Sequence, residues 1–526
     1  MIIRNGNQTL SYYNPKSQSR LSQVVEADIC IYGATSAGVV AAVQASLLGK
    51  KAVIVDLGYH IGGMTTSGLS ATDIGNTHVI GGLSRKFYRD CGRHYGKEES
   101  WFFEPKIAQK IYFDWIDQYD IPIFLGCPLV GTEKHHNRIL SFDTEDGRTF
   151  KAKVFIDASY EGDLMARGGV RFTFGRESNS QYDELFNGIY WGSTHHNFIR
   201  FVDPYCKPGD PSSGLLFGVS DMSLGNMGEG DTLIQAYNFR LCLTKNQKNK
   251  IPFPKPKEYD PQKYELLRRY IESGVFDIFN LTRSIQEGKF DHNNWGAINT
   301  DFISGNYDWP DGDFNTREKI FQDHVNYQQG LFWFCANDPK LHKDVRELTS
   351  QWGLASDEFT DTNNWPPQLY IREARRMVSD YVLTEHDALG RYPIQDSIGL
   401  ASYRMDSHNC KRIYHSGRVI NEGNVEIAPL SPIPIPYRTI TPKRQECENL
   451  LVPVCLSASH IGYGAVRMEP VFMILGQSAA VAATLACQKD CIVQNISYSD
   501  LEKALISSGQ IVKEPENYKT RLITSL

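Results

Sequence analysis

Residues 27–68 read ADICIYGATSAGVVAAVQASLLGKKAVIVDLGYHIGGMTTSG, and this stretch decides the fold. The short apolar run 27–32 predicts a buried strand, and the small residues of 39–48 predict a helix. A second apolar run, 52–55, predicts another strand that ends at Asp56. Strand, helix and strand within about thirty residues make one βαβ unit of the size that binds a dinucleotide.

The turn between the first strand and the helix carries the glycine pattern of dinucleotide sites. Gly33 permits a tight turn, and Gly38 lets the helix approach the strand closely. A helix N-terminus offers free N–H groups and a positive dipole end to a pyrophosphate. Thr35 replaces the middle glycine of G-x-G-x-x-G, so its hydroxyl either donates to a phosphate or is merely tolerated. The residues predicted to bind the dinucleotide here are Gly33, Ala34, Thr35, Ser36, Ala37, Gly38, Leu57 and Asp56, the last through ribose hydroxyls.

A glycine doublet follows Asp56 closely, in the sequence GGMTTSG from Gly62 to Gly68. Here the chain resembles the FAD-dependent oxidoreductases of the glutathione-reductase-like superfamily, whose members have two dinucleotide-binding domains. GGMTTSG itself resembles one subgroup of that superfamily. The resemblance implies that the cofactor is FAD and that its ribityl and flavin portion runs past Gly62, Gly63, Met64 and Ser67.

Two later stretches extend the resemblance. Residues 154–159 predict a strand after a hairpin at Asp146-Gly147, and the strand runs into DASYEGD. In the family such a strand returns to the cofactor, whereas the alternative is an ordinary strand end capped at Asp163. Residues 450–454 predict a strand and 469–486 a helix, whose N-terminus in the family faces the flavin and stabilises negative charge on it. The further cofactor contacts implied are Val130, Ala158, Ser159, Gly162, Met468 and Glu469.

The fold class expected is α/β: a Rossmann-like FAD-binding domain with a mixed sheet and an inserted α+β substrate domain. The first part of the FAD domain is placed at 24–175. The insert is placed at 176–430, where prolines, asparagines and tryptophans accumulate. The C-terminal part that closes the flavin site is placed at 431–526. Residues before Ala27 are expected to form a loose arm.

The arginines of 369–381, LYIREARRMVSDY, allow two interpretations. On a helix, Arg372 would share a face with Arg375 or Arg376 and could hold an anionic substrate or an FAD phosphate. The favoured interpretation is that these arginines pair with neighbouring acids such as Glu373 and Asp380.

The composition limits the classes of binding partner that the protein is expected to have. A net charge of −6 argues against nucleic acid or an anionic membrane surface as the main partner. No run of membrane-spanning length is expected from the apolar residues, and no secretory signal is visible, so a cytoplasmic location is expected. The eleven cysteines include no C-x-x-C pair, which indicates reduced thiols and no metal site. The composition is compatible with a homo-oligomer.

The function expected is oxidation of a polar alcohol or sugar-like small molecule by hydride transfer to FAD. Such an enzyme needs a base for the coupled proton. His460, beside Tyr463 and Arg467 and just before the last long helix, is one candidate, and His408 is the other. Either histidine could be structural. The alternatives are a flavin-dependent reductase of an unsaturated substrate and a flavin-binding protein without turnover.

Overall fold

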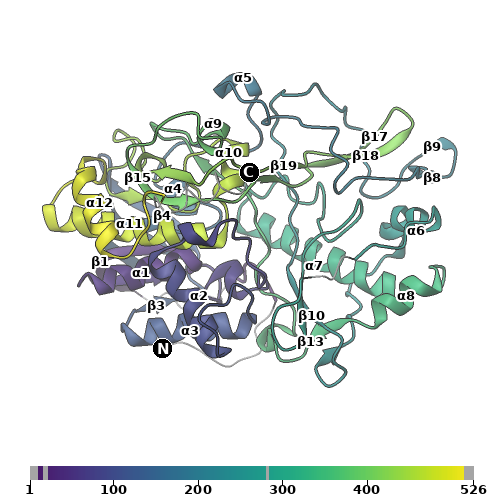
Figure 1. Ribbon diagram of the computed structural model, residues 1–526, viewed down its shortest axis with the longest axis horizontal. Coiled ribbons are helices and arrows are strands. Elements are labelled where there is room, and N and C mark those ends of the chain that lie inside the picture. The colour runs from purple at the N-terminus through teal and green to yellow at the C-terminus, as the bar shows by residue number, and fades with distance from the viewer. Residues whose placement is uncertain (1–9, 16–21, 280–282, 515–526) are drawn as a thin grey trace, which may run out of the picture.

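The computed structural model describes residues 10–15, 22–279 and 283–514, and its first lobe is built on a mixed sheet of seven strands (Figure 1). These strands are β1 (Gln23–Tyr32), β2 (Ala52–Val55), β3 (Ile123–Phe124), β4 (Leu129–His135), β5 (Arg138–Thr144), β6 (Arg148–Asp157) and β21 (Leu450–Leu451). Their order is β3-β2-β1-β6-β5-β4, and β21 pairs with β6. The pairs among β1, β2, β3, β6 and β21 are parallel, whereas β4, β5 and β6 form an antiparallel meander. The expected α/β fold is confirmed.

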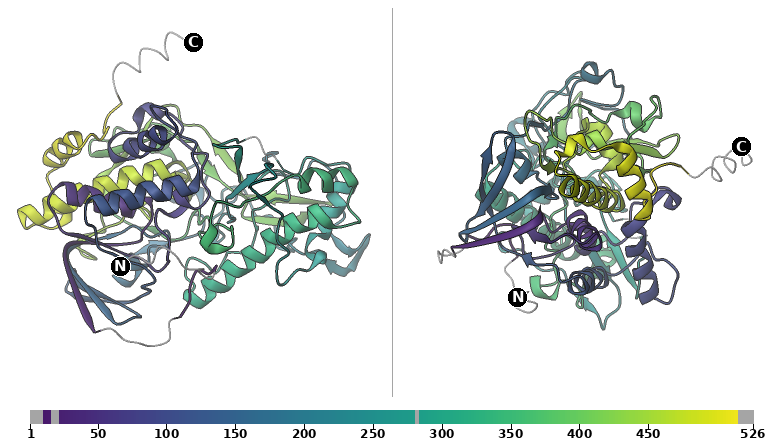
Figure 2. Two further views of the ribbon diagram at one scale, coloured as in Figure 1. Left: turned by 90° about the horizontal axis from the view of Figure 1, so that it is seen from below. Right: turned by 90° about the vertical axis from the view of Figure 1, so that its left-hand side faces the viewer.

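Helices of the two chain ends pack on this sheet. The longest are α1 (Ser36–Leu47), α2 (Gly82–His94), α3 (Pro105–Gln118), α11 (Glu469–Lys489) and α12 (Tyr498–Ser507). Figure 2 shows α11 lying beside α1, and the close approach needs Gly476, because a Cβ there would collide with the carbonyl oxygen of Ala37. The chain after residue 430 therefore completes the same lobe as residues 27–68.

Helix α11 corrects one expectation from the sequence. By length and composition it is apolar enough to cross a membrane, although no run of that length was expected. Of the window that meets this test, 89 % is buried inside the protein. Its apolar character is accounted for by its position in the core, between the sheet and the flanking helices.

The second lobe is formed by the middle of the chain. Its long helix α7 (Phe314–Asn337) starts where the Asp313 carboxylate accepts a hydrogen bond from the N–H of Thr316. Beside it lie α6 (Glu265–Glu272), α8 (Lys343–Ser350) and a four-stranded antiparallel sheet in the order β11-β13-β10-β12 (Figure 1). The strands of that sheet are β10 (Leu241–Thr244), β11 (Lys250–Ile251), β12 (Lys289–His292) and β13 (Gly353–Ala355).

Shorter strand pairs and helices lie outside the two larger sheets. The pairs are β7 (Phe172–Thr173) with β14 (Arg376–Met377), β8 (Tyr205–Lys207) with β9 (Asp210–Leu215), β15 (Ser397–Ala401) with β20 (Ile433–Pro436), β16 (Met405–Ser407) with β19 (Val425–Ile427), and β17 (Lys411–His415) with β18 (Arg418–Glu422). The short helices are α4 (Asp163–Arg167), α5 (Asn179–Tyr182), α9 (Glu385–Ala388) and α10 (His460–Val466). A 3-10 turn, η1 (Gly63–Thr66), follows the glycine doublet.

Two local expectations are wrong. The described residues before Ala27 do not form a loose arm, because β1 already begins at Gln23 and the N–H groups of Tyr12 and Tyr13 donate to the Glu318 carboxylate. The rest of the expected arm, 1–9 and 16–21, lies outside the described residues. Residues 369–381 do not form the helix considered for them: they contain no helix, and their only strand is β14, of two residues.

The arginines of that segment do pair with acids, as the favoured interpretation had it. Arg376 pairs with its neighbour Glu373 and also with Glu177. Arg372 pairs with Asp301 at 2.9 Å and Arg375 with Asp163 at 2.7 Å. The acids are mostly distant in sequence, so these ion pairs join separate parts of the chain.

Candidate active site

A groove runs across the carboxyl ends of β1 and β2, where the βαβ unit was expected to hold its cofactor. Thr35 caps α1: its hydroxyl accepts from the N–H of Gly38 and donates to the carbonyl of Ala158 at 2.7 Å. The hydroxyl thus fixes the turn against β6. The carboxylate of Asp56 accepts from the N–H groups of Ala34 and Gly58, which holds it at the groove wall.

The groove residues fit FAD. Asp56 stands at the end of the second strand, at the place where a carboxylate accepts from ribose, and the α1 N-terminus opens beside it. Among the described residues, the hydroxyl of Ser67 is a buried polar group of the groove wall without a hydrogen-bond partner. A buried hydroxyl of this kind is normally paired, so it is suited to a polar ligand. FAD would be held by Thr35, Asp56, Gly63, Ser67 and Ser159.

The predicted cofactor residues divide into two groups. Those that line the groove are Ala34, Thr35, Asp56, Leu57, Gly63, Ser67 and Ser159. Those that support the turn or lie elsewhere are Gly33, Ser36, Ala37, Gly38, Gly62, Met64, Val130, Ala158, Gly162, Met468 and Glu469. Val130 does not line the groove. The residue is 51 % exposed on β4, and its carbonyl accepts a hydrogen bond from Arg167.

Glu469 begins α11 and joins three parts of the FAD lobe. Its carboxylate accepts hydrogen bonds from the hydroxyls of Ser36, Thr65 and Tyr160, at 2.6, 2.6 and 2.7 Å. Burial raises the pKa of Glu469, and the three hydroxyl donors oppose that rise. The side chain therefore ties the start of α11 to α1 and to the turn after the glycine doublet.

A polar cavity of about 200 Å³ lies between the lobes. It is many times larger than the roughly 10–15 Å³ that one water needs. Ser67 lines the groove and Asp73, six residues later, lines the cavity, so one short segment connects the two sites. Asp291 secures this segment by accepting from the N–H groups of Ser70 and Ala71.

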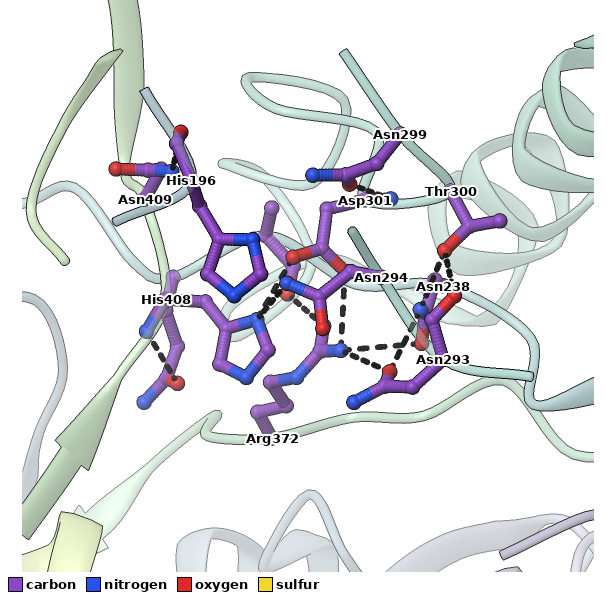
Figure 3. Close-up of polar contacts among 12 residues, drawn as sticks. His196, Asn238, Asn293, Asn294, Asn299, Thr300, Asp301, Arg372, His408 and Asn409 are labelled. Carbon is purple, nitrogen blue, oxygen red and sulfur yellow. Dashed lines mark hydrogen bonds and ion pairs between the residues drawn. The ribbon is translucent and has the colours of Figure 1, made fainter. Parts of the chain in front are cut away.

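His408 lies in the cavity wall and is oriented by an acid (Figure 3). Its Nδ1 is 2.7 Å from Oδ2 of Asp301, and Oδ1 of Asp301 is 2.9 Å from the guanidinium of Arg372. Burial raises the pKa of Asp301, but the charges of Arg372 and His408 outweigh burial and bring it well below the usual range. Asp301 is thus an anion that holds one ring nitrogen of His408, while Nε2 remains on the side of the cavity, 3.9 Å from Asp406.

His460 is held differently. It starts α10 and is 2 % exposed, with Nδ1 2.7 Å from Glu373 and Nε2 3.0 Å from the hydroxyl of Ser407. Burial, assisted by Arg376, lowers the pKa of His460 to about 3. It is not among the residues that line the groove or the cavity, so the structure places it inside a packed network.

The two side chains predicted to act beside His460 are also buried. The Tyr463 hydroxyl donates to the carbonyl of Val454. Arg467 donates to the Tyr370 hydroxyl at 3.1 Å and pairs with Asp406 at 3.2 Å, and both of these partners line the cavity. Arg467, which precedes α11 in the chain, therefore holds two residues of the cavity wall in place.

Sequence reasoning missed most of the cavity. Asp301 and Arg372 were not recognised as the partners that orient His408, and Asn293, Asn294 and Tyr370 were not recognised as lining residues. The available signal in the sequence is the polar run DHNNWGAINTD at 291–301. This run supplies Asp291, Asn293, Asn294 and Asp301.

The comparison with protein families shows to which family the chain belongs. A family described as "FAD dependent oxidoreductase" matches residues 28–505. The chain belongs to this family. It is therefore an FAD-dependent oxidoreductase, and FAD, expected from the glycine doublet, is its cofactor.

No curated protein matches the chain. Among solved structures, the chain is similar to a geranylgeranyl bacteriochlorophyll reductase-like protein from Thermoplasma acidophilum, with 10 % identity, a TM-score of 0.35, and 93 % and 85 % of the two chains covered. It is also similar to T. acidophilum thioredoxin reductase, with 20 % identity, a TM-score of 0.18 and coverage of 30 % and 40 %. The L-amino acid deaminase from Proteus vulgaris gives 16 % identity, a TM-score of 0.21 and coverage of 32 % and 55 %. The chain thus spans 40 % and 55 % of the last two proteins.

Proposed function

We propose that this FAD-dependent oxidoreductase oxidises a polar, sugar-like alcohol bound in the cavity between the lobes, with hydride transfer to flavin N5. The observation that carries the proposal is the Asp301–His408 pair, which presents a ring nitrogen to a polar cavity one segment away from the groove. FAD, when bound, supplies the hydride acceptor. The chain must supply the base.

His408 is suited to hold the hydroxyl proton. Its Nδ1 donates to the Asp301 anion, which leaves Nε2 as the acceptor. When Nε2 takes the proton of an alcohol, the nearby carboxylate stabilises the imidazolium that results. Arg372 keeps Asp301 in place and charged, and is itself fixed by the side-chain oxygens of Asn238 and Asn293 (Figure 3).

The cavity wall supports a substrate with several hydroxyls. Its amides, Asn293, Asn294 and Asn424, can each donate and accept, as hydroxyl groups require. Acids and arginines of the same wall add charged acceptors and donors, namely Asp73, Asp291, Asp406, Arg283 and Arg404. Trp295 contributes a flat apolar surface beside them. An apolar alcohol would displace water from these polar groups without replacing its hydrogen bonds, which lowers its binding.

The test is anaerobic flavin reduction by a substrate panel. Sugars, sugar alcohols and hydroxy acids are compared with apolar alcohols of matched size, and flavin absorbance is followed. We expect bleaching by at least one polyhydroxylated compound and none by the apolar set. Bleaching by apolar alcohols alone would contradict the substrate class. Failure of every alcohol, together with reoxidation of chemically reduced enzyme by an unsaturated carbonyl compound, would favour the reductase alternative.

A further inference from the structure

Two adjacent histidines meet a carboxylate on the wall of the cavity. His195 and His196 lie in the loop before β8, and Glu426 lies in β19, 230 positions away from His196. One ligand atom from each of the three residues lies within 4.8 Å of the other two. Zinc binds histidine nitrogen and carboxylate oxygen at about 2.0–2.2 Å, so small side-chain rotations bring all three onto one ion. All three residues line the cavity.

One ring nitrogen of the histidine pair has no partner within the protein. Among the described residues, Nδ1 of His196 is a buried ring nitrogen without a hydrogen-bond partner. Buried polar atoms are normally paired, so this nitrogen is suited to hold a ligand.

The carboxylate is also held in place from behind. Arg404 donates to Oε2 of Glu426 at 2.6 Å, and Asn424 lies 3.4 Å from Oε1. Metal-binding carboxylates are commonly oriented by such outer partners. Oε1 is the oxygen that contacts His195, so it faces the histidine pair.

A second cluster of possible metal ligands is already occupied by a lysine side chain. Glu104, Asp357 and Glu358 also come within ligand distance of one another. There the ammonium of Lys289 lies 2.6, 2.8 and 2.6 Å from the three carboxylates and occupies the position that an ion would take. At the histidine pair, Arg404 contacts only the outer oxygen of Glu426, and no lysine of the described residues pairs with that carboxylate.

We propose that His195, His196 and Glu426 form a binding site for a divalent transition metal of the zinc type on the cavity wall. Two histidines and one carboxylate are a ligand set used for zinc with an open position. All three proposed ligands line the cavity together with His408, and Figure 3 shows the ring of His196 near that of His408. The inference goes beyond the oxidoreductase activity and does not depend on which substrate is oxidised.

The test measures metal binding directly. Chelator-treated holoenzyme is titrated with ZnCl₂, and bound zinc is measured by equilibrium dialysis and elemental analysis. The exposed thiol of Cys206 is replaced by Cys206→Ser in every sample, so that it does not add a ligand. We expect one zinc per chain. The double variant His195→Ala/His196→Ala is expected to lose it, and Glu426→Gln to weaken it at least tenfold.

The matched control is His135→Ala/His136→Ala, another adjacent pair, exposed at the turn between β4 and β5. It is expected to keep full zinc binding. FAD content and Tm are measured for each variant, which separates loss of the site from misfolding. Cobalt(II) gives a second readout, because its visible absorption reports the ligand set. The proposal is overturned if the parent protein binds no zinc, or if the His195/His196 variant binds as much as the parent.

Discussion

The groove and the cavity differ in where their central residues come from. The groove takes its turn, helix start and acid from one contiguous stretch, around Thr35 and Asp56. The cavity takes its wall from segments scattered between Asp73 and Glu426. The same contrast separates the two histidines: His460 follows the FAD-lobe pattern in sequence yet is packed on every side, whereas His408 comes from the middle region and faces the cavity. Position in a motif indicates proximity to the cofactor but does not indicate access to a substrate.

The largest expected effect is that of His408→Asn. Removing a general base typically costs about 10²–10⁴-fold in rate. Stopped-flow flavin reduction should slow by that factor once a substrate is found, while FAD content is unchanged. His460→Asn is the control and should keep a near-normal rate per bound flavin. If His460→Asn is the slow variant, the assignment of roles to the two histidines is reversed.

Asp301→Asn tests whether the acid acts through His408. The exchange replaces a charge-assisted hydrogen bond, worth about 1.5–3 kcal/mol, and should slow flavin reduction about 10- to 100-fold. A rate equal to that of the parent protein across pH 6–9 would show that Asp301 only supports Arg372.

Asp56→Asn examines the groove in the same way. Loss of the charge should weaken FAD retention about tenfold, because a charge-assisted hydrogen bond becomes an ordinary one. Flavin reduction per bound FAD should stay unchanged, since Asp56 lies outside the cavity. Equilibrium dialysis against FAD measures retention. Unaltered retention would show that the carboxylate serves only the N–H groups of Ala34 and Gly58.

The smallest expected effect concerns stability and pH. His460 is neutral in the folded protein, with a pKa of about 3, and has a pKa near 6.5 when unfolded. As pH falls from 6.5 towards 3, the unfolded chain binds a proton that the folded chain does not, so stability is lost. At pH 5.5 this amounts to about 1 kcal/mol. Urea unfolding of His460→Gln should therefore depend less on pH than that of the parent, and equal slopes would contradict burial of the neutral ring.

The sequence was sufficient wherever the interacting residues are close together in it. The βαβ unit, the hairpin at Asp146-Gly147 and helix α11 follow from periodicity, turn residues and small side chains. The absence of a helix around Arg372 was not predictable, because the arginines of this segment pair with Asp301, Asp163 and Glu177, which lie far away along the chain. The histidine pair His195-His196 was overlooked for the same reason, since its carboxylate is supplied by β19.

The segment at residues 10–13 has a consequence for the order of assembly. Leu10, Ser11 and Tyr12 line the groove, and the segment is anchored by Glu318 in α7. One wall of the cofactor groove therefore waits, during synthesis, for residues made some three hundred positions later. The two hydrogen bonds to Glu318 therefore link the groove wall to the second lobe.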